Sequence, residues 1–150
     1  MTSTIYNTAD FGNTLIELSK KSNKIEIFSA FIKLKALETI ASHINKEAQV
    51  KIVARWKYED IASKASDLEV YNFCKTNNWS FGIDLKMHQK IYRFDDDTVL
   101  LGSNNLTASG LALQSNYNNE AGVKLKIINQ EIFMEYYNQV VWLDDDLFKK

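Results

Sequence analysis

Residues 88–107 read HQKIYRFDDDTVLLGSNNLT, and this stretch decides how the chain folds. Two runs rich in β-branched and aromatic residues, 88–94 and 97–103, meet at an aspartate-rich junction, which is typical of two strands joined by a turn. We therefore expect an antiparallel hairpin. In such a hairpin the start of the first strand lies beside the end of the second, so His88 should lie close to the Gly-Ser-Asn-Asn sequence at 102–105.

The residues at this end of the expected hairpin suit a bound anion. His88 and Lys90 are two apart on one strand and therefore point to the same side. An imidazole can attack or move a proton near neutral pH, and an ammonium group neutralises negative charge. In the following loop, Gly102 permits close approach of the backbone, while Ser103 and Asn105 can donate hydrogen bonds to phosphate oxygens.

The sequence before the hairpin alternates between strand and helix patterns. Apolar residues recur at helical spacing in 8–22 and 33–48, whereas 24–31 and 49–56 are rich in apolar and β-branched residues. The stretch 59–78 predicts one broken helix or two short ones. Alternation of this kind favours parallel strands with helices packed on the sheet.

From Trp79 onward the expected strands follow one another closely, which favours antiparallel pairing; they are 79–85, 88–94, 98–104 and 118–127. A closing helix is expected over 129–145. The predicted fold class is therefore α/β, with a mixed central sheet flanked by helices on both faces. No proline and no flexible linker divides the chain, so we expect a single domain over residues 1–150.

Composition narrows the class of protein. The 150 residues are 45% hydrophobic and 25% charged, which is typical of a soluble globular domain. No apolar run is long enough to span a bilayer, and no signal peptide is visible, so we expect no membrane contact. The single cysteine, Cys74, excludes an internal disulfide and agrees with a cytoplasmic location; we expect it to be a packing residue of a helix.

The charge of the chain does not by itself indicate a nucleic-acid binder. The formal net charge is -1, whereas a binding domain for nucleic acid is commonly basic. The basic residues are unevenly placed, however, with an early group followed by a second one; they are Lys20, Lys21, Lys24, Lys33 and Lys35, then Lys51, Arg55 and Lys57. These residues could form a local basic face, although solvated surface is the commoner explanation for such groups of charges.

The spacing His88-x-Lys90-x4-Asp95-x6-Gly102-Ser103-x-Asn105 resembles the HKD motif of the phospholipase D superfamily. The likeness continues through GSNNLTASGLALQSNYNNEAGV at 102–123, where Glu120 occupies the place of an acidic residue that follows the family's GSxN loop. The resemblance covers most of the chain and is specific between residues 86 and 123. It implies the half-domain fold of that family.

The resemblance also implies roles for the motif residues. His88 would be the nucleophile that attacks a phosphodiester and forms a phosphohistidine. Lys90, Ser103 and Asn105 would bind the phosphate oxygens and stabilise the charge of the transition state. Glu120 would orient or polarise a histidine of the site.

No metal or cofactor is implied by the resemblance. The aspartates at 95–97 fit an acidic turn better than a metal cluster, because adjacent carboxylates cannot all converge on one ion. Asp95, although part of the motif, is expected to have a structural role in that turn.

The sequence indicates less clearly which residues outside the motif contact the substrate. Arg55 ends an expected strand, where α/β sheets often bind ligands, and it could contact a phosphate, as could Lys33 and Lys35; ordinary surface positions explain them equally well. Trp56 and Tyr58 could stack on a base, although packing is the favoured reading.

A complete site in this family uses two HKD motifs, one histidine attacking and one protonating the leaving group. This chain carries one motif. Its only other histidine, His43, lies on an expected helix, has no lysine two residues later and has no GSxN partner. The second motif is therefore expected from a second copy in a homodimer.

The function implied is a metal-independent endonuclease acting on DNA, or on RNA. The chain resembles small bacterial endonucleases, and FSAFIKLKALETI at 28–40 resembles restriction-type and helicase-associated nuclease domains. A separate DNA-recognition domain or subunit could add affinity. Two alternatives stay open: a lipid phosphodiesterase or transphosphatidylase, and a non-catalytic dimeric module of a larger restriction or helicase complex.

Overall fold

The structure is a computed structural model that describes residues 4–127 and 129–149. The strands are β1 (Lys24–Ser29), β2 (Gln49–Ala54), β3 (Ser80–Ile83), β4 (Lys90–Phe94), β5 (Thr98–Gly102), β6 (Gly122–Lys126) and β7 (Val141–Trp142). The helices are α1 (Thr8–Lys21), α2 (Leu34–Ala41), α3 (Tyr58–Ala62), α4 (Glu69–Thr76), α5 (Glu131–Asn138) and α6 (Asp145–Phe148). Within the described ranges, no helix is long and apolar enough to cross a membrane.

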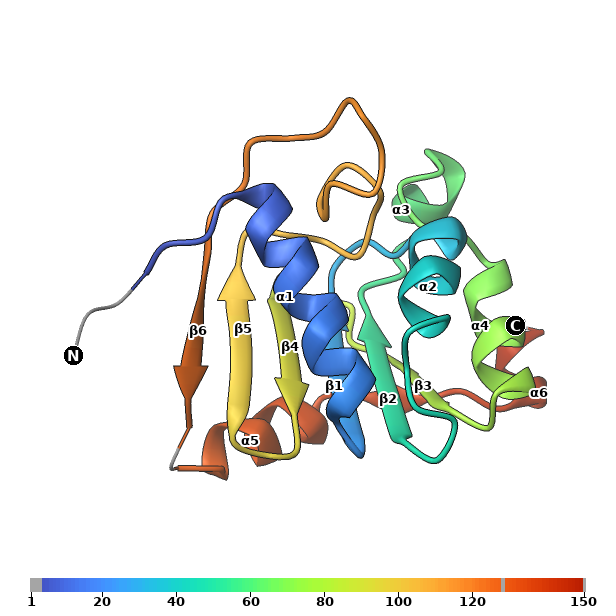
Figure 1. Cartoon of the computed structure of the whole chain (residues 1–150). Helices are drawn as coiled ribbons and strands as arrows, with labels where there is room; N and C mark the ends of the chain where they lie inside the picture. The colour runs from blue at the N-terminus through green and yellow to red at the C-terminus, as the bar shows by residue number, and fades with distance from the viewer. Residues whose placement is uncertain (1–3, 128, 150) are drawn as a thin grey trace.

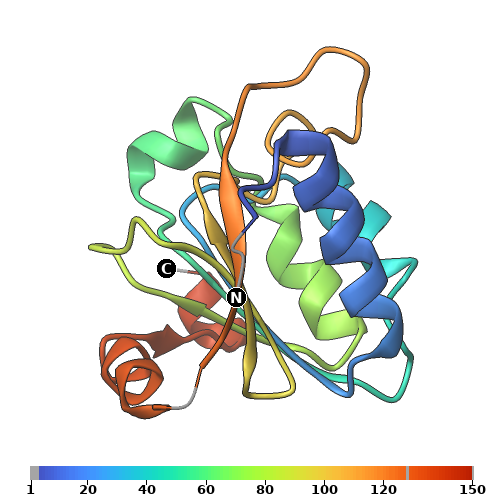
Figure 2. The ribbon, with the colours of Figure 1, turned by 60° about the vertical axis from the view of Figure 1, so that its left-hand side comes forward.

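One mixed sheet organises the molecule, with the strand order β6-β5-β4-β1-β2-β3-β7 across the described residues. The strands β1, β2 and β3 run parallel, while β4, β5 and β6 are joined by antiparallel ladders, as is β4 to β1. Figure 2 shows α1, α2 and α4 on one face of the sheet and α5 on the other. The predicted α/β class, with helices on both faces of a mixed sheet, is confirmed, and so is the hairpin of β4 and β5.

The expectation of antiparallel pairing from Trp79 onward is wrong for β3. This strand lies parallel to β2, with Lys51 opposite Ser80. The two short helices between them, α3 and α4, form the crossover that a parallel pair needs. After β3 the chain passes to the far side of β1, so β3 and β4 are consecutive in sequence but are not neighbours in the sheet.

Two expected helices are shorter than their sequence patterns predicted. The helix expected over 33–48 ends at Ala41, so that His43 lies in the turn that follows α2. The helix expected over 129–145 ends at Asn138, and the chain then forms β7, which pairs with β3, and α6. Valine and tryptophan favour strands, and pairing with the edge of β3 overrides the helical spacing of the apolar residues in this segment.

Alternating side chains divide the sheet between two cores. Ile27, Ile52 and Tyr92 belong to the larger core, beneath α1, α2 and α4, while Phe28 and Val53 belong to the smaller core beneath α5. Consecutive residues of one strand, such as Ile27 and Phe28, thus point to opposite faces of the sheet, as the period of two requires. Cys74 is buried on α4, and burial raises the pKa of its thiol to about 12, which fits the packing role expected for it.

A buried charge pair holds α5 against its face of the sheet. Glu26 and Arg93 lie opposite each other in the β1–β4 ladder, with Arg93 Nη1 3.2 Å from Glu26 Oε2. The Tyr137 hydroxyl donates to the same carboxylate oxygen, and the Arg93 guanidinium lies 4.0 Å from the centre of the Phe133 ring. Burial, followed by the Glu26 carboxylate, raises the pKa of Tyr137. This helix is therefore held by charge as well as by apolar contact.

His88, Lys90 and the Gly-Ser-Asn-Asn segment at 102–105 lie at one end of the sheet, whereas Asp95 lies at the other. Ser29, the last residue of β1, is opposite Lys90, the first residue of β4, and the following residues of β4 pair with the end of β5. In Figure 1, α3 and the long loop between β5 and β6 rise above this end. Lys24 begins β1 and therefore lies at the opposite end, together with the C-terminus of α1.

Gly102 is required by the contact between β5 and β6. A Cβ atom at this position would lie 2.4 Å from the carbonyl oxygen of Ala121 and 2.7 Å from Cα of Gly122. Both are backbone atoms of the neighbouring strand region, so they cannot rotate away. The absence of a side chain at Gly102 thus lets the backbone of β5 come close to the backbone at Ala121 and Gly122.

We expect Gly102→Ala to lower the free energy of unfolding by about 1–3 kcal/mol, because the added methyl group must push two paired backbones apart. Urea denaturation followed by circular dichroism measures this loss. Val123→Ala, on the adjacent strand and half-buried, is the matched control that removes volume instead of adding it. A Gly102→Ala protein as stable as the natural chain would contradict the close packing described.

Candidate active site

His88 and Lys90 are in direct contact. Lys90 Nζ lies 2.9 Å from His88 Nδ1 and 3.5 Å from Nε2, and it also donates to the His88 carbonyl at 3.0 Å. An ammonium group can only donate hydrogen bonds, and the tautomer of the imidazole decides which ring nitrogen accepts from it. The histidine is exposed and lies two residues before the start of β4, where a substrate can reach it.

Two charges act on Lys90 from other parts of the chain. Burial lowers the pKa of Lys90 below its usual value, the positive charge of Arg55 lowers it further, and the negative charge of Glu120 opposes both. Arg55 comes from the end of β2 and Glu120 from the segment before β6. The structure therefore brings both residues within electrostatic reach of the motif lysine.

The backbone at the end of β1 orients Asn105. Its carbonyl oxygen Oδ1 accepts a hydrogen bond from the Phe31 amide at 3.3 Å; Ser29 Oγ lies 3.4 Å from the same oxygen but donates to the Phe31 carbonyl at 2.7 Å. Ser29 Oγ in turn accepts from the Leu106 amide at 2.9 Å. Because the Phe31 amide holds the oxygen, the NH2 group of Asn105 is the part that can donate to an anion.

The loop around Asn105 is supported from inside the core. Asn104 is fully buried, and its Nδ2 donates to the Gly110 carbonyl at 2.8 Å. The buried Tyr92 hydroxyl donates to the Asn104 carbonyl at 2.8 Å. Burial raises the pKa of Tyr92, so the phenol keeps its proton and remains a donor. A buried tyrosine thus supports the loop that presents Asn105.

Ser103 and Glu120 form a hydrogen-bonded pair at the same end of the sheet. Ser103 Oγ donates to Glu120 Oε1 at 2.8 Å and accepts from the Ala121 amide at 3.1 Å. The Glu120 amide donates to Thr8 Oγ1 at 2.8 Å, which fixes the backbone from the start of α1. For Ser103 to donate to a phosphate, as its motif position implies, its proton must leave Glu120. The carboxylate that was expected on a histidine is thus held by Ser103.

Asp95 lies at the other end of the sheet from His88. Its Oδ1 accepts from the amides of Asn23 at 2.9 Å and Lys24 at 3.0 Å, and its backbone is in the left-handed region with φ 51°. The next two aspartates pair with lysines: Asp96 with Lys24 and Asp97 with Lys126. These hydrogen bonds lower the pKa of both carboxyl groups. Among the described residues, no three His, Cys, Asp or Glu side chains gather as ligands for a metal.

The three basic residues considered as substrate contacts have different surroundings. Arg55 forms a two-pronged ion pair with Asp60, through Nε at 2.9 Å and Nη2 at 2.8 Å. Lys33 Nζ lies 2.8 Å from Asp67 Oδ1 and 2.7 Å from the Lys64 carbonyl, so it joins the start of α2 to the segment between α3 and α4. Lys35 is exposed on the first turn of α2.

Three residues that support the site were not identified from the sequence. Tyr92 shares the face of His88 and Lys90 by the period of two, and this spacing could have indicated it. Ser29 and Asp60 meet their partners, Asn105 and Arg55, only through the fold, and no motif marks them.

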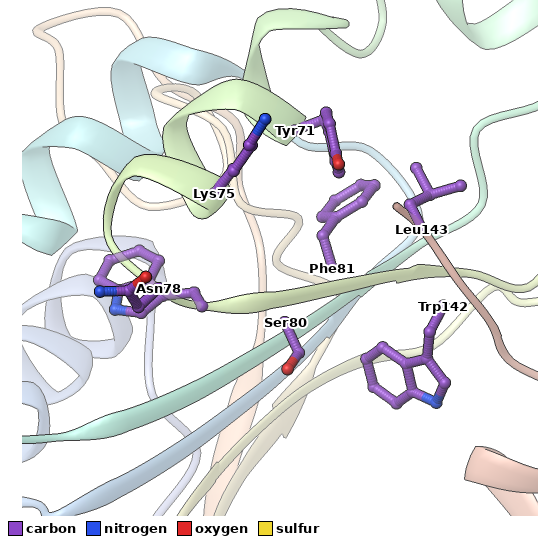
Figure 3. Close-up of a pocket in the computed structure, with 8 residues that line it drawn as sticks. Tyr71, Lys75, Asn78, Ser80, Phe81, Trp142 and Leu143 are labelled. Carbon is purple, nitrogen blue, oxygen red and sulfur yellow. The ribbon is translucent and has the colours of Figure 1, made fainter. Parts of the chain in front are cut away.

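A separate pocket of about 320 Å³ lies between α4, β3 and β7 (Figure 3), outside the motif. It is lined by aromatic side chains that include Phe81 and Trp142, together with Lys75. The Tyr71 ring on its wall stacks on Phe148 at 4.5 Å, and its hydroxyl donates to Asp145 at 2.8 Å. This pocket belongs to the packing of the C-terminal segment against α4.

We expect Tyr92→Phe to lower the free energy of unfolding by about 1–3 kcal/mol, since it leaves the buried Asn104 carbonyl without its donor. Thermal and chemical denaturation measure this change. Tyr136→Phe, on α5 and half-buried, is the matched control for removal of a hydroxyl. Equal stabilities of the Tyr92→Phe protein and the natural chain would show that this bond does not hold the loop.

Comparison with known proteins agrees with this geometry. The family model described as "Cardiolipin synthase, PLD-like domain" matches residues 1–142. A search of curated proteins gave no match. Among solved structures, NucT from Helicobacter pylori is 18% identical with a TM-score of 0.62, and 91% of each chain is covered.

Two further solved structures share the fold. Nuc from Salmonella typhimurium, a phospholipase D family member, is 18% identical with a TM-score of 0.65; 96% of this chain and 99% of that chain are covered. Phosphatidylserine synthase from Haemophilus influenzae is 19% identical with a TM-score of 0.67, but only 35% of that longer chain is covered. Taken with the match of the family model over residues 1–142, the fold and the motif residues show that this chain belongs to the phospholipase D-like family.

Proposed function

We propose that the chain is a phosphodiesterase that needs no metal and acts on nucleic acid. The observation that carries this proposal is the contact of Lys90 with the His88 imidazole, beside the amide of Asn105 and the carboxylate of Glu120. A nucleophile, a cation and oriented donors at one place suit attack on a phosphodiester. Lys90 and Arg55 supply the positive charge for the transition state.

The contact of Lys90 with His88 suggests how substrate starts the reaction. In the tautomer in which Lys90 donates to Nδ1, the ring proton lies on Nε2, and that nitrogen cannot attack. A phosphate oxygen is a stronger acceptor for the ammonium group than an imidazole, so binding draws Lys90 away. The proton can then move to Nδ1, where a carboxylate can hold it, and Nε2 gains the lone pair that attacks phosphorus.

The covalent step needs a second acid. Attack forms a bond between His88 nitrogen and phosphorus and breaks the bond from phosphorus to the leaving oxygen, which takes a proton from another imidazolium. That imidazole, now neutral, removes a proton from water, and the hydroxide breaks the nitrogen–phosphorus bond and restores His88. We propose that the second histidine is His88 of a second copy.

Two observations support a second copy. His43 lies between α2 and β2, at the end of the sheet away from Lys90, so it does not suit the role of the acid. Leu85, three residues before His88, is 56% exposed and lines an apolar groove with Val141, which is also 56% exposed. Apolar surface next to a reactive histidine is what a contact between two copies would bury.

Nucleic acid is favoured over lipid as the substrate by two features. The match to this chain covers nearly the whole length of NucT and of Nuc, whereas it covers only 35% of the phosphatidylserine synthase chain. This agrees with the resemblance of the sequence to small bacterial endonucleases. The alternative is a lipid phosphodiester, and the description of the matched family model as a cardiolipin synthase domain favours it.

We expect the protein to hydrolyse bis(p-nitrophenyl) phosphate and DNA in the presence of EDTA. His88→Ala should remove this activity, and Lys90→Ala or Asn105→Ala should lower it about a hundredfold or more, because they remove groups that stabilise the transition state. His43→Ala is the matched control. Activity that vanishes with EDTA and returns with magnesium would overturn the proposed mechanism, and hydrolysis of phosphatidylglycerol vesicles but not DNA would favour the lipid alternative.

We expect His88→Ala subunits to inactivate natural subunits with which they pair. After exchange of equal amounts, about a quarter of the dimers are fully natural and about half are mixed. A shared site leaves about a quarter of the activity of the same total protein, whereas independent sites leave about half. The same exchange with His43→Ala subunits is the control. Residual activity near half would rule out the shared site.

A further inference from the structure

The segment 55–58, with the sequence Arg-Trp-Lys-Tyr, leaves β2 at the end of the sheet where the motif lies. The Arg55 amide donates to the Ala30 carbonyl at 3.4 Å, and the Arg55 guanidinium lies 4.9 Å from the centre of the Phe31 ring. The Phe31 amide in turn donates to Asn105. One residue, Phe31, therefore joins this segment to the loop that presents the Asn105 amide.

A single carboxylate makes the segment rigid. Asp60 is buried; it accepts from Arg55 Nε and Nη2 and also from the Lys57 amide at 3.1 Å. The hydrogen bond from Arg55 is the main cause that lowers the pKa of Asp60, so the carboxylate stays charged. Because the ion pair uses Nε and Nη2, the Nη1 side of the guanidinium is the part that can donate to a further anion.

The two aromatic residues of the segment point to different surroundings. Trp56, with a left-handed backbone at φ 45°, packs inward with its ring centre 4.7 Å from that of Phe81. Tyr58, which begins α3, is 84% exposed. The expectation that these residues pack is thus confirmed for Trp56 and wrong for Tyr58. An inward Trp56 leaves Tyr58 on the outside of the turn, and the exposed Lys57 lies beside it.

An exposed tyrosine next to fixed cations suits one class of ligand. Single-stranded nucleic acid binds proteins through cations that follow the phosphates and aromatic rings that stack on the bases. Tyr58 is three residues from Arg55, and three residues span at most about 10 Å of chain. A strand whose phosphate is held at Lys90 and Arg55 can therefore bring an adjacent base to the Tyr58 ring. The exposed Glu59 reduces the local positive charge but not the stacking surface.

We propose that residues 55–58 form the subsite for the nucleotide next to the cleaved bond: Tyr58 stacks on its base, and Arg55 binds its phosphate through Nη1. The preferred substrate is then a single strand, because the faces of bases in a duplex are already stacked. This inference rests on the proposed function and names the substrate class of the same site. A lipid headgroup, which has no base, would gain nothing from Tyr58.

The test compares substrates that have or lack bases. The full chain is assayed on a single-stranded thymidine oligonucleotide, an abasic oligomer of the same length, the matched duplex and bis(p-nitrophenyl) phosphate. Tyr58→Ala should lower the ratio of kcat/KM for the oligonucleotide to kcat/KM for the small diester about tenfold, while Tyr58→Phe keeps it. The ratio of kcat/KM for the abasic oligomer to kcat/KM for the small diester should be the same in Tyr58→Ala and in the natural protein. Met134→Ala, which truncates a 67% exposed side chain on α5, is the control.

Arg55 is tested by Arg55→Lys, which keeps the charge but removes the planar fork. This variant should lower kcat/KM for the oligonucleotide and for the abasic oligomer by the same factor, since the proposed contact of Arg55 is to phosphate. A Tyr58→Ala ratio within twofold of the natural one, an equal loss on the abasic oligomer, or a preference for the duplex would overturn the proposal.

Binding separates this inference from the proposed function. In the His88→Ala background, fluorescence anisotropy with the labelled oligonucleotide and the abasic oligomer reports stacking without turnover. Tyr58→Ala should raise Kd about tenfold for the oligonucleotide only. If Tyr58→Ala weakens binding in this way but the natural protein hydrolyses no diester, the subsite is kept and the proposed phosphodiesterase activity is overturned. Hydrolysis of DNA with a Kd unchanged by Tyr58→Ala would keep the phosphodiesterase and overturn the subsite.

Discussion

The register of β4 between β1 and β5 is the constraint on which the site depends. Lys90 lies opposite Ser29 on one side, and Ile91 lies opposite Leu101 on the other. These two ladders bring the end of β1, the start of β4 and the GSxN loop to one end of the sheet, where hydrogen bonds join Phe31 to Asn105 and Tyr92 to Asn104. A slip of one residue would turn Lys90 to the face covered by α5 and exchange it with a core residue, so the burial of both faces fixes the register.

The positive charge of the site comes from few residues. The lysines at the end of α1 and the start of β1 lie at the opposite end of the sheet, so they do not enlarge the charged surface around His88. The charges that act on Lys90 beside His88 are those of Arg55 and Glu120, and Asp60 offsets much of the charge of Arg55. In a chain with net charge -1, affinity for a polyanion has to come from placement more than from total charge.

Local patterns predicted most of the fold, and long-range pairing explains what they missed. The hairpin and the motif lie within twenty consecutive residues, so alternation and spacing identified both. The place of β3 beside β2 depends on which strands meet across a crossover, which no local pattern contains. In the site, the motif indicated His88 and Lys90, but Ser29, Asp60 and Thr8 act on residues 5 to 112 positions away in sequence, and only the folded chain brings them together.

The loop between β5 and β6 is held at two separate places. Near its start, Asn104 binds the Gly110 carbonyl; near its end, Thr8 binds the Asn118 carbonyl and the Glu120 amide. The exposed residues 114–117 between them carry none of these bonds. Lengthening this part costs only the slowly growing entropy of loop closure. The site can therefore tolerate insertions here, which makes this loop a place where a new substrate-binding element could be added without moving Asn105 or Glu120.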